Sequence, residues 1–336
     1  MIKDQVKEEK EKEEREARDE GRKPPRARAL RVPRGYRLVS KIAEGGMATV
    51  YRAVQTALDR VVAVKVLSEK YASDPSYIER FLREAKLAAT LSHPNIVSAI
   101  DVGERGGKYY FVMEFVEGES VMDLIARTGA LPERRALEIV LQVAGALEHA
   151  RRKGLIHRDM KPANILMDRE GTAKLADMGL ARKVSAPESS RQTSAGIIVG
   201  TPDYLSPEQA RGEEDLDTRA DIYSLGVTLF HMTTGRLPFE DKSPLTVIMK
   251  HLHEPAPRAS DLNPAVSQGT TLILLKAMEK DRDLRYSTPA EMASDVEDVL
   301  RGEEPRLAFG HDPGGGPGRG PTSWRRGRFR RSPGAE

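Results

Sequence analysis

Short runs of apolar residues separated by polar turns dominate the chain from residue 36 to about residue 116. The runs are rich in β-branched and aromatic residues and cover residues 36–43, 49–54, 61–67 and 109–116. Glycine-containing turns are expected at residues 44–46 and 105–107. Because β-branched and aromatic side chains suit strands and glycine suits tight turns, this pattern predicts a mostly antiparallel β-sheet.

Helical repeats interrupt this region once and then replace it. Asp74 suits an N-cap and Pro75 the first helical position, and the apolar residues that follow share one face: Ile78, Phe81, Leu82, Ala85, Ala88 and Ala89. From about residue 118 helical patterns take over, and one of them, over 132–154, begins at a proline and ends in three basic residues before a glycine. A small β-rich part followed by a larger helical part predicts an α+β protein of two lobes with a cleft between them.

The two ends of the chain lack this patterning. Residues 1–33 are densely charged and almost without apolar positions, whereas residues 303–336 are rich in Gly, Pro and Arg. We therefore predict a disordered tail over 1–33, an N-lobe over 34–117, a C-lobe over 118–302 and a flexible tail over 303–336. No apolar run approaches the length that crosses a bilayer, so we expect a cytoplasmic protein without a membrane span.

Charge and cysteine content narrow the classes of function. The chain has 336 residues, a net charge of +3 and no cysteine. The tails 1–33 and 313–336 carry +2 and +5, which leaves −4 for the body, so the basic total does not predict a nucleic-acid partner. Without cysteine, the chain has no disulfide, thiol nucleophile or cysteine-ligated zinc. The histidines at 231, 251 and 253 lack metal-ligand spacing, which favours structural or surface roles.

Chargeable residues are unusually dense in residues 155–166, between a helix and an apolar strand. Asp159 could act as a base, Lys161 could neutralise anionic oxygens, and Asn164 could help a carboxylate to hold a hard divalent cation. Asp177 supplies such a carboxylate at the end of the next short strand. Taken alone, a polar loop of this kind is more often simply solvated, and an Asp at the end of a strand is more often a capping residue. The prediction of a catalytic site therefore depends on the two occurring together.

The run HRDMKPAN at residues 157–164 resembles the catalytic loop of protein kinases. Other kinase signatures follow in the right order, because VAVK ends at Lys65, Glu84 lies in the next predicted helix, and DMG begins at Asp177. The segment SPE at 206–208 resembles the Ala-Pro-Glu motif of protein kinases. The segments EGGMATVYRA and GTPDYLSPEQARG are similar to those of bacterial Hanks-type serine/threonine kinases. The resemblance covers residues 36 to about 300 and implies a bilobal protein-kinase-like fold.

The resemblance implies a role for each matched polar residue. Lys65 would hold the α and β phosphates of ATP with Glu84 as its ion-pair partner. Asn164 and Asp177 would bind Mg²⁺, with Mn²⁺ as an alternative, and Asp159 would accept the proton of the acceptor hydroxyl. Lys161 would contact the γ-phosphate, and Thr201 would form hydrogen bonds with Asp159 and Lys161. The remaining matched residues would have structural roles: Arg158, Glu208, Asp221 and Arg285.

The nucleotide site implied by the resemblance is mostly apolar and departs from the family at the glycine-rich loop. Its members would be Val50, Ala63 and Leu166 around the adenine, Met113 behind it, backbone groups of Glu114 to Val116 at its edge, and Ala43, Gly45, Gly46 and Ala48 in the loop. Only the middle glycine of G-x-G-x-x-G keeps its place, and Ala43 could weaken ATP binding. A nucleotide-binding pseudokinase scaffold therefore stays open as an alternative, with a small-molecule kinase as a second.

The segment between Asp177 and Glu208 suggests regulation by phosphate. Residues 182–200 are hydrophilic and rich in Ser and Thr, and Arg158 supplies a cation with which a phosphate could pair. We predict autophosphorylation at Thr193, with Ser194 next. The substrates would be Ser/Thr hydroxyls of proteins, as expected of a non-specific serine/threonine protein kinase, and a homodimer for trans-autophosphorylation is left open.

Overall fold

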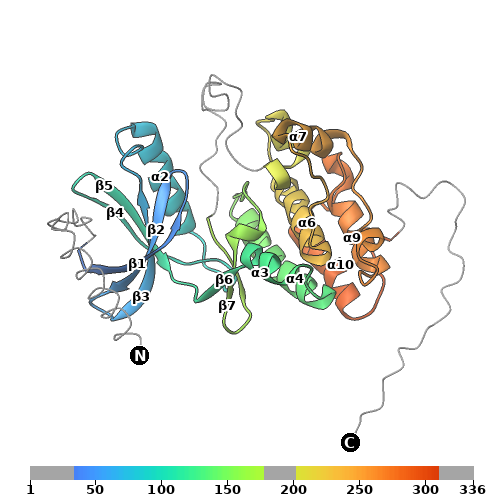
Figure 1. The fold of residues 1–336 in the computed structure, drawn as a ribbon, viewed down its shortest axis with the longest axis horizontal. Coiled ribbons are helices and arrows are strands. Elements are labelled where there is room, and N and C mark those ends of the chain that lie inside the picture. Colours follow the sequence, from blue (N-terminus) through green and yellow to red (C-terminus); the bar gives the residue numbers. More distant parts are fainter. Residues whose placement is uncertain (1–33, 178–201, 310–336) are drawn as a thin grey trace, which may run out of the picture. The chain divides into compact units, whose positions relative to one another are not determined.

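The computed structural model describes residues 34–177 and 202–309, which form two compact units (Figure 1). The first unit holds residues 34–86 and 99–115, and the second holds residues 87–98 together with the described residues from 116 onward. The β-rich part of the sequence thus forms one unit and the helical part the other.

The first unit is built on a five-stranded antiparallel sheet with the strand order β1-β2-β3-β5-β4. Its strands are β1 (Tyr36–Glu44), β2 (Ala48–Gln55), β3 (Arg60–Leu67), β4 (Ala99–Arg105) and β5 (Lys108–Glu114). The core of the sheet is a small cluster of fully buried aliphatic residues, Ala53, Val62, Val64 and Val112. The antiparallel sheet predicted from the short apolar runs is confirmed, and it contains one further strand, β4, that these runs did not include.

Helix α2 (Pro75–Ala88) follows β3 and begins where the sequence predicts. The carboxylate of Asp74 accepts a hydrogen bond from the backbone N–H of Ser76 at 2.8 Å, which satisfies one of the free donors of the first turn. Phe81, Ala85 and Ala88 are buried, so most of the predicted apolar face packs, whereas Ala89 lies past the end of the helix and is exposed.

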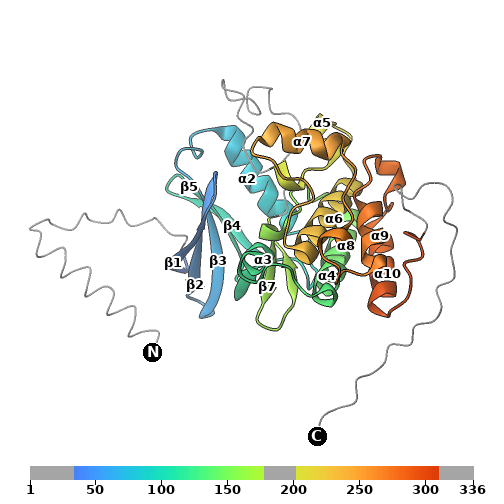
Figure 2. The same cartoon turned by 45° about the vertical axis from the view of Figure 1, so that its right-hand side comes forward.

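The second unit is mainly helical and contains a small three-stranded sheet (Figure 2). Its helices are α3 (Val121–Thr128), α4 (Glu133–Arg152), α5 (Pro207–Arg211), α6 (Thr218–Thr234), α7 (Pro244–His253), α8 (Ala259–Leu262), α9 (Gln268–Ala277) and α10 (Pro289–Leu300). The strands are β6 (Gly118–Ser120), β7 (Ile165–Asp168) and β8 (Ala173–Leu175), and 3-10 turns cover Pro162–Asn164, Pro202–Tyr204 and Arg282–Leu284.

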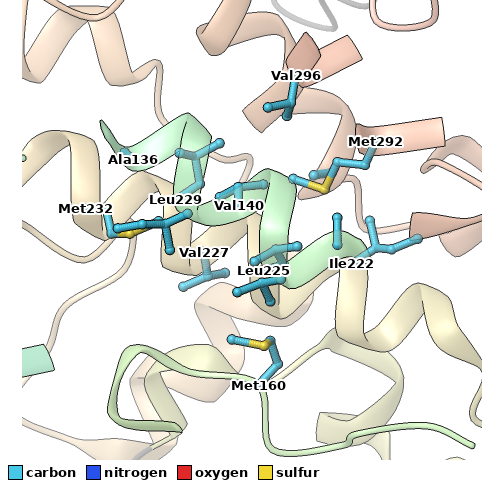
Figure 3. Close-up of a cluster of buried hydrophobic side chains, with 14 of the residues drawn as sticks. Ala136, Val140, Met160, Ile222, Leu225, Val227, Leu229, Met232, Met292 and Val296 are labelled. Carbon is cyan, nitrogen blue, oxygen red and sulfur yellow. The ribbon is translucent and has the colours of Figure 1, made fainter. Parts of the chain in front are cut away.

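Helix α6 is the centre of the second unit, because almost every residue along it is buried. Val140 of α4, Ile222 and Leu225 of α6, and Met292 of α10 meet in one apolar cluster (Figure 3). A helix that is apolar all round is a helix surrounded by others. Polar side chains carried on α6 are therefore held rigidly, and this rigidity is important for the candidate active site.

The second unit continues past residue 302, where the sequence pattern places the start of a flexible tail. The backbone N–H groups of Leu307 and Ala308 donate to the buried carboxylate of Asp295 at 2.9 and 2.8 Å. The guanidinium of Arg306 binds the carboxylate of Asp298 through two hydrogen bonds of 2.7 and 2.8 Å. These contacts fix the segment 303–309 against α10.

Within residues 34–177 and 202–309, none of the helices combines the length and the apolar character that a bilayer span requires.

Candidate active site

The loop before β7 is anchored to the buried helix α6 by Asp221. The two carboxylate oxygens of Asp221 accept hydrogen bonds from the backbone N–H groups of His157 and Arg158, each at 2.8 Å. Burial raises the pKa of Asp221, and the hydrogen bonds from those two backbone donors lower it in part. Arg158 adopts a left-handed backbone with φ of 67°, a conformation that non-glycine residues rarely take. The loop therefore turns sharply at the residue before Asp159.

Two neighbouring side chains hold the carboxylate of Asp159 in one orientation. The Nζ atom of Lys161 lies 2.9 and 3.1 Å from its two oxygens, and the side-chain amide of Asn164 donates to its Oδ2 at 3.0 Å. The same amide donates to the backbone oxygen of Asp159 at 2.7 Å. The Asp159 side chain is nevertheless 54% exposed, so this carboxylate remains open to a reactant.

The residue before Asp177 is fixed from both sides by this loop. The N–H of Ala176 donates to the backbone oxygen of Asn164 at 2.8 Å, and its carbonyl accepts from Nε2 of His157 at 3.1 Å. Asp177 then turns into the left-handed region with φ of 50°. The structure thus brings the backbone of the two predicted cation ligands, Asn164 and Asp177, to the same place.

Sequence reasoning did not assign a role to His157. Its ring is fully buried, and its Nδ1 accepts from the N–H of Asp159 at 3.3 Å while Nε2 donates to the carbonyl of Ala176. This pattern fixes the neutral tautomer that carries the proton on Nε2. His157 is therefore a positioning residue that joins the Asp159 loop to the strand before Asp177, and the signal was its place two residues before Asp159.

The ion pair predicted for the first unit is formed between β3 and α2. The Nζ atom of Lys65 lies 3.1 Å from Oε1 of Glu84, and each side chain is 15% exposed. Because both partners are partly withdrawn from water, the pair is less screened than a surface pair. Lys65 is therefore extended towards α2 by a carboxylate nineteen residues further along the chain.

The residues predicted to line a nucleotide site lie on both units. Val50 pairs with Lys65 across β2 and β3, and Ala63 pairs with Met113 across β3 and β5. Glu114 ends β5, Val116 is the first residue of the longer segment of the second unit, and Leu166 lies on β7. The first unit therefore places Val50, Ala63, Met113 and Lys65 on adjacent strands.

The glycine-rich segment forms the turn between β1 and β2. Ala43 pairs with Val50, and the N–H of Gly45 donates to the carbonyl of Ala48 at 2.9 Å, with Gly46 between them. Ile42, an apolar residue that is 48% exposed, lies at the register shift between Lys41 and Ala43.

The candidate structural ion pair is buried in the second unit. The guanidinium of Arg285 forms two hydrogen bonds of 2.7 and 2.9 Å with the carboxylate of Glu208, and the side chains are 0% and 3% exposed. A further hydrogen bond runs from the side chain of Gln209 to the carbonyl of Arg158 at 2.7 Å. Helix α5 is thus tied both to the C-terminal helices and to the loop that carries Asp159.

Several predicted features lie outside the described residues. These are the tail 1–33, the part 310–336 of the C-terminal tail, the end of the DMG run at 178–179, the phosphorylation candidates Thr193 and Ser194, and Thr201.

Comparison with known proteins identifies the class to which this fold and loop belong. The family profile described as Protein kinase domain matches residues 36–296. The chain therefore belongs to the protein kinase family, and the predicted bilobal α+β fold is confirmed.

The most informative relatives are bacterial serine/threonine kinases, as the resemblance implied. The chain is 43% identical to serine/threonine-protein kinase PrkC of Bacillus subtilis over 286 residues, and this alignment covers 84% of this chain and 43% of PrkC. It is 41% identical to PknB of Mycobacterium leprae over 274 residues, and that alignment covers 80% of this chain and 44% of PknB. The chain thus spans less than half the length of these curated relatives.

Solved structures give the same family. The PknI kinase domain of Mycobacterium tuberculosis superposes with a TM-score of 0.64 at 31% identity, covering 81% of this chain and 99% of that chain.

Proposed function

We propose that this chain is an ATP-dependent protein serine/threonine kinase that transfers the γ-phosphate of ATP to Ser and Thr hydroxyls of proteins. The observation that carries the proposal is the half-exposed carboxylate of Asp159, held by Lys161 and Asn164 in a loop anchored to a buried helix. Phosphoryl transfer needs alignment of the acceptor and neutralisation of charge more than covalent help from the protein. A fixed base beside a fixed cation supplies both.

In this proposal Asp159 orients the acceptor hydroxyl and accepts its proton. Lys161, whose Nζ lies 2.9 Å from that carboxylate, offsets the negative charge of the transferred group. The paired Lys65 supplies a second cation, kept extended by Glu84 for the α and β phosphates. Two observations favour an active kinase over the pseudokinase alternative. The chain belongs to the protein kinase family, and its set of charged residues is intact.

The donor set in the second unit fits Mg²⁺. The amide nitrogen of Asn164 is used by Asp159, which leaves the amide oxygen for a cation, and Asp177 adds a carboxylate one residue after the fixed Ala176. Hard oxygen ligands of this kind are the ones that Mg²⁺ prefers, and Mn²⁺ accepts them as well. When bound, the ion would neutralise phosphate charge. The described residues contain no cluster of three or more His, Asp or Glu side chains that would favour another metal.

The test is transfer of labelled phosphate from ATP to a generic basic protein, with and without Mg²⁺, followed by identification of the labelled amino acid. We expect label on Ser and Thr that requires the ion. ATP binding without transfer would instead support the pseudokinase, and transfer to a small molecule alone would support the second alternative.

A further inference from the structure

A chain of buried and partly buried hydrogen bonds runs from Lys280, which follows α9, to the 3-10 turn Pro202–Tyr204. The Nζ atom of Lys280 lies 3.1 Å from the hydroxyl of Tyr223, which lies 2.9 Å from Nδ1 of His251 on α7. Nε2 of His251 lies 3.0 Å from the backbone oxygen of Asp203. Four segments distant in the sequence are thus joined through one imidazole ring.

The chemistry of the two ends fixes the direction of the two outer bonds in this chain. An ammonium group can only donate and a backbone carbonyl can only accept. Lys280 therefore donates to Tyr223, and Nε2–H of His251 donates to Asp203. In a neutral ring with its proton on Nε2, Nδ1 accepts from the Tyr223 hydroxyl.

The surroundings of His251 keep the ring in that state. The side chain is fully buried, and the ring of Phe239 packs edge-on against it with centroids 5.0 Å apart. Lys280 lies over the same Phe239 ring, 4.4 Å from its centroid. The pKa of His251 is lowered to about 3, mainly because the ring is buried and secondly because Lys280 lies nearby. The ring therefore stays neutral.

The turn held by His251 belongs to a segment that reaches the catalytic loop. At one end Pro202 directly follows Thr201, and at the other Gln209 of α5 donates to the carbonyl of Arg158, next to Asp159. Helix α7 lies beside both α5 and the turn (Figure 2). The hydroxyl of Ser224 adds a bond to the carbonyl of Tyr204 at 2.7 Å.

We propose that His251 is a positioning residue for the protein acceptor, acting through the carbonyl of Asp203. The polypeptide around an acceptor hydroxyl at Asp159 must lie along the segments that adjoin Asp159, and the segment 202–209 is one of them. His251 holds the start of that segment to α7, while Gln209 holds its end to the loop. This inference rests on the proposed kinase function.

Two variants separate the donor of His251 from its acceptor. His251→Gln places an amide N–H near Nε2 and keeps the bond to Asp203, whereas His251→Asn places a carbonyl near Nδ1 and keeps only the bond to Tyr223. Both variants are smaller than His, and the Asn side chain is one methylene shorter than the Gln side chain, so the KM for ATP is measured as well to reveal a general packing defect. The exposed His253 of the same helix, changed to Gln and to Asn, provides the matched controls.

The readouts are the KM for a protein acceptor, the KM for ATP, and amide hydrogen exchange of residues 202–210. We expect His251→Asn to raise the acceptor KM roughly tenfold with an unchanged ATP KM, and His251→Gln to stay within about twofold of wild type. Exchange in 202–210 should accelerate in His251→Asn alone.

Equal effects of the Asn and Gln variants on both readouts would overturn the inference, because the histidine would then act only through packing. Unchanged exchange in His251→Asn would overturn it as well. Hydrogen exchange needs no turnover, so it tests the role of His251 even if wild-type protein transfers no phosphate, which would contradict the proposed function instead.

Discussion

Lys161 and Asp159 form an ion pair in which Nζ lies 2.9 Å from Oδ2, on a loop whose backbone is bonded to the buried Asp221. A cation fixed beside the proposed base can stabilise the charge that develops on the transferred phosphoryl group. We therefore expect Lys161→Ala to lower kcat by about 10²- to 10³-fold, with less than a threefold change in the KM for ATP.

Steady-state kinetics with a protein acceptor measures this effect. Lys242→Ala removes an exposed lysine from the same unit and should leave both constants unchanged. A kcat for Lys161→Ala within threefold of wild type would show that this cation has no part in transfer.

The ion pair between Glu208 and Arg285 predicts a large effect on stability. Its side chains are 3% and 0% exposed, so Glu208→Gln leaves a buried guanidinium without its counter-charge. We expect the free energy of unfolding to fall by about 3–5 kcal/mol in urea denaturation. The control is Glu138→Gln, which breaks an exposed pair with Arg134 and should cost less than about 1 kcal/mol. Similar losses in the two variants would contradict the role of burial.

Burial of neutral His251 predicts a loss of stability in acid. The pKa of His251 is lowered from 6.5 to about 3 in the folded protein, so its contribution is complete above pH 6.5 and is lost as the pH falls towards 3. The slope approaches about 1.4 kcal/mol per pH unit below 6.5. The pKa of Lys280 is lowered to about 7 in the folded protein. This group therefore reduces the free energy of unfolding as the pH falls from 10.5 to 7. Below pH 7 it no longer changes the dependence of stability on pH.

Unfolding of wild type and His251→Gln should therefore be compared between pH 6.5 and 5, because the glutamine does not titrate. We expect the difference in free energy of unfolding between the two proteins to shrink as the pH falls. A difference independent of pH would show that His251 carries its ordinary pKa.

The segment after α10 predicts where the folded body ends. Truncation after Gly302 removes two backbone donors from the buried carboxylate of Asp295, whereas truncation after Phe309 keeps them. We expect the shorter chain to be less stable by roughly 2–4 kcal/mol, because each lost buried hydrogen bond leaves the carboxylate less satisfied. Equal urea midpoints for the two chains would contradict this account of Asp295.

Strands β1, β2, β3 and β5, helix α2 and the catalytic loop could be predicted from sequence because their signals are local, whereas β4 was missed. Asp74 and Pro75 mark the start of α2 within two residues, and HRDMKPAN is one uninterrupted run. The partner of Lys65 could also be predicted, because the resemblance to protein kinases implied Glu84 in the next helix. Local patterns of this kind need no knowledge of distant contacts.

The parts that sequence did not predict depend on contacts between distant segments. The spacing of His251 favoured a structural or surface role, and the bonds that give it a structural one are seen only from the positions of Asp203, Tyr223 and Lys280 around it. The segment 303–309 has the composition of a tail, but Asp295 satisfies its backbone from another element. Such partners are set by packing and leave no periodic signal along the chain.

The most direct test of the account is phosphate transfer by Asp159→Asn, measured together with ATP binding. The amide cannot accept the proton of the acceptor hydroxyl, yet its size preserves the loop. We predict that kcat falls by about 10²- to 10⁴-fold while the Kd for ATP changes less than threefold. Transfer at the wild-type rate by Asp159→Asn would contradict the account.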